Sequence, residues 1–196
     1  MAAANSVRSD RVLTRVTRSA LGVLLLTSVH HAYGAYAYDT PWRLHVVLVS
    51  ALVTTAILVL RPLLRRPAGS ALAKIAFWTF TAIVAAVPIG LIGLFEGGYN
   101  HGVKNILYFG GASTTLMTRL FPPPTYELPN DLFFELTGTA QAVCGVIAGY
   151  QLLALIRDRR RRRASVTNEH LGTFSSAAPT QQAERIVSLS RQGLDQ

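Results

Sequence analysis

The stretch IAFWTFTAIVAAVPIGLIGLF, residues 75–95, has no ionisable side chain and is long enough to cross a membrane as one helix. A hydrocarbon core about 30 Å thick requires roughly 20 helical residues. Three further stretches have comparable length and apolarity, at about 19–38, 41–60 and 131–156. The sequence therefore predicts an all-α integral membrane protein built as a four-transmembrane-helix bundle. Asn130 is the residue expected to cap the fourth span.

The composition favours a membrane protein and argues against a nucleic-acid-binding one. The chain has 196 residues, of which 50% are hydrophobic, and a formal net charge of +9. Proteins that bind nucleic acids gather Lys and Arg on one surface, whereas the basic residues here alternate with long apolar stretches. Cys144 is the only cysteine, so the chain has neither an intrachain disulfide nor a thiolate metal site.

The distribution of Lys and Arg predicts the orientation in the membrane. Four Arg precede the first span, four basic residues lie between the second and third, and six Arg follow the fourth. Because cytoplasmic flanks carry the excess of Lys and Arg, both termini are expected in the cytoplasm, with the protein in the plasma (inner) membrane. One alternative is that the first span is a cleaved signal peptide, since Ala35-Tyr36-Ala37 resembles a cleavage site.

These flanks divide the chain into three predicted parts. A basic N-terminal arm covers residues 1–18 and the membrane domain residues 19–156. Residues 157–196 form a basic flank and a tail rich in Ser, Thr, Ala and Gln, which we expect to be mostly disordered, with a short helix around Ala183 to Leu189. Within the membrane domain, Gly97-Gly98 is expected to end the third span. Residues 96–130 then form an outer cap of short interfacial or re-entrant helices, broken at Gly110-Gly111.

Ionisable side chains gather on the side of the membrane that Lys and Arg avoid. Because such groups are costly at membrane depth, a cluster of them indicates a functional site. Glu96 gives the clearest indication of such a site, since a carboxylate at a helix C-terminus opposes the helix dipole and needs a compensating positive charge. Imidazole and carboxylate together suit copper, zinc or iron. The sequence thus predicts a metal site built from some of six residues: His30, His31, His45, Glu96, His101 and Glu135.

Several other functions are compatible with the same residues. Histidines near an interface can simply bind neighbours or lipid head groups. Haem b held by His30 or His31 together with His45 is a less favoured cofactor. Proton or small-solute transport is a further possibility, since Glu135, Thr139 and Gln141 continue a polar path into the fourth span.

The fourth span also offers a surface for another helix. Small residues three or four apart share one face of a helix and let a second helix approach closely. Gly138, Ala142, Gly145 and Ala148 have this spacing. The chain could therefore be a non-catalytic accessory or assembly subunit that uses this face to bind other membrane subunits. Whether the protein is an enzyme is not decided by the sequence.

Overall fold

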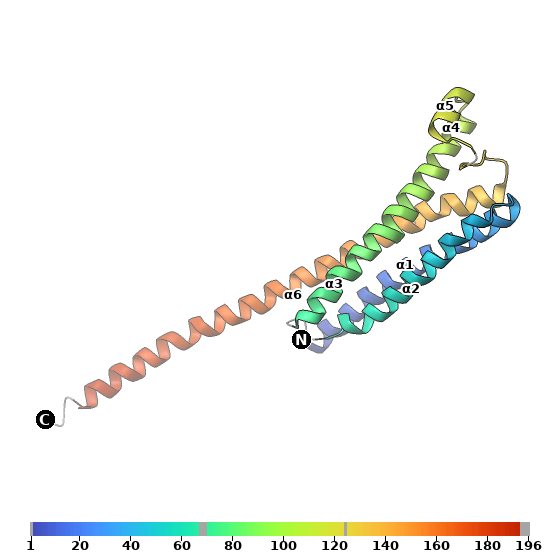
Figure 1. The fold of residues 1–196 in the computed structure, drawn as a ribbon. Helices are drawn as coiled ribbons and strands as arrows, with labels where there is room; N and C mark the ends of the chain where they lie inside the picture. Colours follow the sequence, from blue (N-terminus) through green and yellow to red (C-terminus); the bar gives the residue numbers. More distant parts are fainter. Residues whose placement is uncertain (1, 67–69, 124, 193–196) are drawn as a thin grey trace. The chain divides into compact units, whose positions relative to one another are not determined.

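The computed structural model describes residues 2–66, 70–123 and 125–192, and the described residues form helices and turns without a strand. The chain divides into two compact units, Met1–Leu155 and Ile156–Gln196. The elements, shown in Figure 1, are α1 (Ala2–Ala37), η1 (Pro41–Leu44), α2 (His45–Leu64), α3 (Ala71–Val84), η2 (Ala85–Val103), α4 (Lys104–Phe109), α5 (Thr114–Leu120) and α6 (Leu132–Gln192).

Four helical segments are long and apolar enough to span a membrane, which confirms the predicted all-α membrane bundle. They are Val7–Ala37, Pro41–Leu64, Ala71–Phe109 and Leu132–Arg162. Large apolar side chains such as Leu25, Leu52, Ile75 and Val146 are exposed on their surfaces. A surface of this kind is stable in contact with lipid and unstable in water. The chain is therefore a membrane protein in contact with a bilayer.

The third span is longer than predicted, because the helix does not end at Gly97-Gly98. After α3, the chain continues as the π-helix η2 through both glycines and then as α4 to Phe109. Figure 1 shows these three elements following one another as one rod. Glu96 therefore lies inside a helix, so the predicted conflict between its carboxylate and a helix C-terminus does not exist. A π-helix forms i→i+5 backbone hydrogen bonds and is frequent at functional sites.

The small-residue face of the fourth span is covered by η2 of the same chain. A Cβ atom added to Gly93 would lie 2.7 Å from the Gly145 Cα, and one added to Gly97 would meet the backbone of Ala142. The expectation that a helix packs closely on this face is correct, but that helix is internal rather than part of another subunit. This contact brings η2 and α6 together over the length that carries the candidate ligands.

The predicted outer cap is interrupted at Gly110-Gly111, as the sequence indicates. Helix α4 ends at Phe109, Gly111 turns the chain with a φ of +80°, and α5 begins after Ser113, whose hydroxyl accepts the Leu116 N–H. A positive φ suits glycine because glycine has no Cβ.

The start of α6 differs by one residue from the prediction. Asp131, rather than Asn130, caps the helix, because its Oδ1 atom accepts the Phe134 N–H at 2.8 Å. Both residue types are good N-caps, so composition alone does not separate them.

The second unit contains a helix where the sequence predicts a mostly disordered tail. In the structure α6 runs through this stretch to Gln192, well beyond Ala183 to Leu189. A helix that is already nucleated adds each further residue at little cost, and Ala, Gln and Arg are good helix formers. Residues 193–196 of the predicted tail lie outside the described part of the chain.

Candidate metal centre

Three side chains from two helices converge inside the first unit: His30 of α1 with Glu96 and His101 of η2. Glu96 Oε1 lies 3.8 Å from His30 Nε2 and 3.6 Å from His101 Nε2. All three atoms lie within 4.8 Å of one another. On an α-helix, residues five apart point about 140° away from each other. The π-helical i→i+5 geometry instead brings Glu96 and His101 to one face.

The hydrogen bonds of Thr137 favour the tautomer of His30 that carries its proton on Nδ1. The Thr137 hydroxyl lies 2.8 Å from the Phe133 carbonyl oxygen and 3.1 Å from the Phe134 carbonyl oxygen, and either can accept its single hydrogen. The same hydroxyl lies 3.0 Å from His30 Nδ1 and, with its hydrogen on a carbonyl, accepts from it. In this tautomer His30 Nε2 is unprotonated, in a ring that is 0% exposed. It has no hydrogen-bond partner in the described part of the chain.

His101 is oriented in a similar way by a carboxylate. Its Nδ1–H donates to Glu135 Oε2 at 2.8 Å, and the other oxygen of Glu135 accepts from Lys104 Nζ at 2.8 Å. Lys104 also donates to the Glu127 carbonyl oxygen. A histidine that donates one N–H to a carboxylate presents the other nitrogen as a more basic ligand. His101 Nε2 is that nitrogen, and it faces Glu96.

Glu96, like the two histidines, has one polar atom held by a hydrogen bond and one that faces the other candidate ligands. Its Oε2 atom accepts a hydrogen bond of 2.7 Å from the Asn100 side chain, whereas Oε1 faces the two histidines. With neutral rings, three acceptor atoms thus point at one another with no hydrogen between them. Such an arrangement is repulsive unless a cation lies among the three atoms or a second proton on His101 turns its 3.6 Å contact with Glu96 into an ion pair.

The three atoms could hold a metal ion after small movements of their side chains. An ion bonded at about 2.1 Å to each of two ligands keeps them roughly 3.0–3.5 Å apart. Because each candidate ligand has its other polar atom held by Thr137, Glu135 or Asn100, the hydrogen bonds expected around metal ligands are already present.

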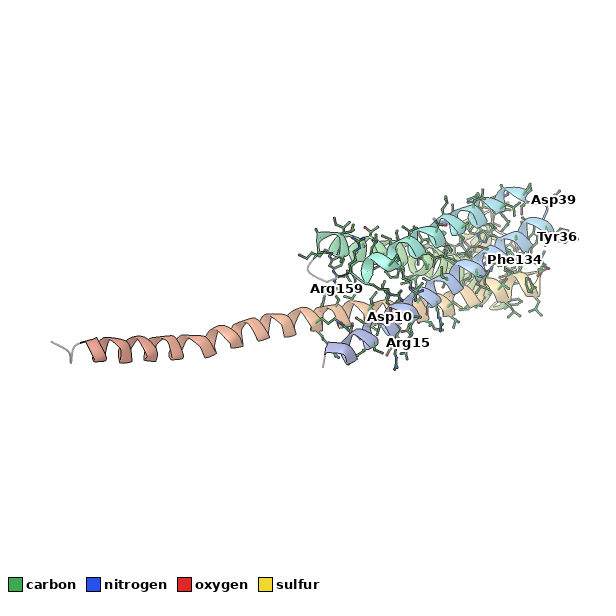
Figure 2. The ribbon with its side chains drawn as sticks, turned by 90° about the horizontal axis from the view of Figure 1, so that it is seen from below. Asp10, Arg15, Tyr36, Asp39, Phe134 and Arg159 are labelled. Atoms are coloured by element: carbon green, nitrogen blue, oxygen red, sulfur yellow. The ribbon has the colours of Figure 1, made fainter. Side chains whose placement is uncertain are left out.

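Packing around Phe134 holds the two rings in place. Its ring stacks on His30 with centroids 4.1 Å apart and meets His101 edge-on at 5.2 Å. On the α1 side, Gly34 leaves room for the Phe134 ring, and Gly138 leaves room for the imidazole of His101. Figure 2 shows Phe134 near Tyr36 and Asp39 at one end of the bundle, whereas Asp10 and Arg15 lie toward the other. We call these the histidine end and the arginine end.

A cavity of about 300 Å³ adjoins two of the three residues. Glu96 and His101 line it, together with His31, His45, Arg43 and Lys104. His31 Nδ1 is buried without a hydrogen-bond partner among the described residues. His45 lies at a more exposed position, where its Nδ1 is 2.6 Å from the Trp42 carbonyl oxygen and its ring stacks on Trp42.

The structure thus separates the six predicted site residues into three groups. His30, Glu96 and His101 converge. Glu135 joins them through a hydrogen bond to His101. His31 and His45 line the cavity beside them, outside the converging group.

Sequence reasoning missed the residues that orient the ligands. Asn100 and Thr137 are neutral, so a search for ionisable groups passes over them. The position of Asn100 four residues after Glu96 could have indicated a contact between the two side chains, since residues i and i+4 are neighbours on a helix.

Comparisons of the chain with protein-family models, curated proteins and solved structures find no match. The functional assignment therefore depends on the geometry of the site.

Proposed function

We propose that this chain is a membrane metalloprotein in which His30, Glu96 and His101 bind one divalent transition-metal ion. The observation that carries the proposal is the set of three acceptor atoms facing one another, each on a side chain whose other polar atom is held. A divalent cation removes the repulsion among them and neutralises the charge of Glu96.

The ligand set and the cavity favour a reactive centre over a structural one. Structural zinc sites are closed by four protein ligands, whereas two histidines and one carboxylate leave coordination positions open. That combination is typical of non-haem iron and also occurs with catalytic zinc. The 300 Å³ cavity beside Glu96 and His101 lets a small molecule reach those positions. Iron is therefore the leading candidate, with zinc and copper as alternatives, in a redox or metal-handling role.

The proposed setting is the plasma membrane, with both termini in the cytoplasm and the histidine end facing outward. The support is the scarcity of Lys and Arg among the residues of the histidine end. A reporter enzyme that is active only outside the cytoplasm, fused after Gly111, is expected to be active. Activity of a cytoplasmic reporter at that position would contradict this orientation.

A second candidate function is that of an accessory subunit of a membrane complex. It is favoured by α2, whose apolar side chains Leu48, Leu52 and Val59 are exposed and could contact either lipid or another protein. Partner subunits that copurify with the chain while metal is absent would support this function over the metal centre.

The direct test is the metal content of the protein purified in detergent. We expect about one equivalent of metal per chain, a strong loss in His30→Ala and Glu96→Gln, and retention in His45→Ala, because His45 lies outside the converging group. Wild-type protein without metal would refute the proposal, as would an equal loss in all three variants. A Soret band in place of non-haem metal would favour the haem alternative.

A further inference from the structure

Arg43 lines the same cavity as the proposed metal ligands. Its guanidinium is buried and lies 5.1 Å from the Trp42 ring and 5.4 Å from the Phe134 ring. The Phe134 ring also stacks on His30, so a single aromatic side chain contacts both the cation and a proposed ligand. Arg43 is therefore close to the metal centre without being part of it.

Arg43 keeps hydrogen-bonding capacity for a ligand. Its Nε donates to the Thr40 hydroxyl at 2.8 Å, and its Nη2 lies 3.5 Å from Glu127 Oε1, at the outer limit of a hydrogen bond. Within the described residues, Nη1 has no hydrogen-bond partner. Because a guanidinium has five N–H donors and recognises carboxylates in a bidentate manner, donors are left over.

The charges around the cavity leave one positive charge in excess once a metal is bound. Lys104 is paired with Glu135 and Arg43 with Glu127, so these four groups cancel in pairs. Burial raises the pKa of Tyr38 to about 12 and also raises the pKa of Tyr126, so both phenols are neutral. A divalent ion bound to Glu96 and two neutral histidines then carries a net single positive charge. At low dielectric such a charge strongly favours a monoanion as the next ligand.

The remaining walls of the cavity are largely apolar. Trp42, Leu91, Ile92, Phe95 and Phe134 line it beside the charged residues. A volume of about 300 Å³ is at the small end of the range for ligand pockets. An inorganic anion would leave these walls without an apolar contact, whereas a small organic acid would cover them.

We infer that the metal centre binds a small monocarboxylate with an apolar body, its carboxylate held by the metal and by Arg43 and its body packed against the aromatic and aliphatic wall. This inference rests on the proposed metal site. It assigns to Arg43 the role of a substrate-binding residue rather than that of a metal ligand.

The test uses the full-length protein in detergent, loaded with Co²⁺ after its metal content has been measured. Acetate, butyrate and the uncharged butyramide are titrated, and the visible absorption of the bound cobalt reports ligand binding. We expect butyrate to bind more tightly than acetate, by roughly fourfold for each CH₂ group that becomes buried. Butyramide is expected to bind at least about tenfold more weakly than butyrate, because it lacks the charge.

Variants assign the role of Arg43. Arg43→Gln is expected to weaken butyrate binding at least about tenfold with its cobalt content unchanged, and Arg43→Lys to weaken it less. Arg65→Gln, at an exposed ion pair of the arginine end, serves as the matched control and should bind butyrate normally.

Two kinds of failure are distinguishable. If the wild-type chain takes up no cobalt, the metal centre itself is refuted. If it takes up cobalt but butyramide binds as tightly as butyrate, or acetate as tightly as butyrate, the carboxylate with an apolar body is refuted while the metal centre stands. Should Arg43→Gln lose its cobalt, Arg43→Lys and the comparison of the three ligands on wild-type protein still decide the inference.

Discussion

The two ends of the bundle both carry ionisable side chains, but they hold them in different ways. At the arginine end, Arg65 and Asp10 form an ion pair of 2.8 Å, with both side chains 49% exposed. At the histidine end, His30 is fully buried and Glu96 Oε1 faces two ring nitrogens rather than a fixed cation. Exposed ion pairs contribute little and are screened by salt. Buried acceptors without donors are unfavourable, so such a cluster favours the binding of a cation.

Charge alone would not have separated the two ends. The arginine end is rich in charge, and its exposed ion pair needs no ligand. The histidine end has fewer charges, but three of its acceptors converge. What marks a site is therefore the balance of hydrogen-bond donors and acceptors at a buried position.

The largest effect is expected from Glu135→Gln, which keeps the size of the side chain but removes the charge that orients His101. Metal affinity should fall about 10- to 100-fold, as is usual when a hydrogen-bond partner of a ligating histidine is lost. A competition titration with a chromophoric chelator measures it. Glu127→Gln is the matched control, because Lys104 contacts only the main-chain oxygen of Glu127. Equal losses in the two variants would mean that Glu135 acts only as one of several charges.

Gly97→Ala should disturb the packing that forms the histidine end. The new methyl group would meet the backbone of Ala142, and overpacking of this kind costs about 1–3 kcal/mol. The thermal midpoint in detergent should fall, and metal affinity with it. Gly22→Ala is the control, since a Cβ there has nothing within 4 Å. That variant should be neutral or more stable, because alanine is the better helix former. An unchanged midpoint for Gly97→Ala would contradict the close contact of η2 with α6.

The four spans could be predicted from sequence because apolar length is a direct consequence of membrane thickness. Glu96 and His101 were also predicted as site residues, but on a chain expected to turn at Gly97-Gly98, where the structure has a continuous helix. A π-helix leaves no clear pattern in a sequence, since the choice between i→i+4 and i→i+5 hydrogen bonds is made by packing against α6. Thr137 was missed because its role comes from a contact 107 residues away in the sequence.

Asp131 offers a smaller test at the start of α6. Hydrogen bonds from the Phe134 N–H and the Tyr33 hydroxyl hold the pKa of its carboxyl below the usual value of 3.8. Asp131→Ala should cost about 1 kcal/mol, as for other N-caps, and Asp131→Asn less. Because the folded-state pKa is lowered, this stabilisation is present above pH 3.8 and is lost as the pH falls through the lower folded value.

The measurement compares thermal midpoints of wild type and Asp131→Asn across that pH range. The difference between the two proteins should shrink as the solution is acidified below pH 3.8, because only the wild type has a carboxylate to protonate. A difference that does not depend on pH would show that the cap works through shape and hydrogen bonding alone. Metal content should stay the same in both proteins, since Asp131 is not one of the converging residues.

The smallest effect is expected at the arginine end, from Arg65→Gln. Both partners of the Arg65–Asp10 pair are half exposed, so its loss should cost no more than about 1 kcal/mol. This small cost should vanish near 1 M salt, where the Debye length is about 3 Å. The thermal midpoint at low and high salt measures it, with metal content as the second readout. A loss of metal in Arg65→Gln would show that the two ends are coupled, and the contrast between an exposed ion pair and a buried site would then fail. Unchanged metal together with a salt-sensitive midpoint would place all of the metal chemistry at the histidine end, where the acceptors outnumber their donors.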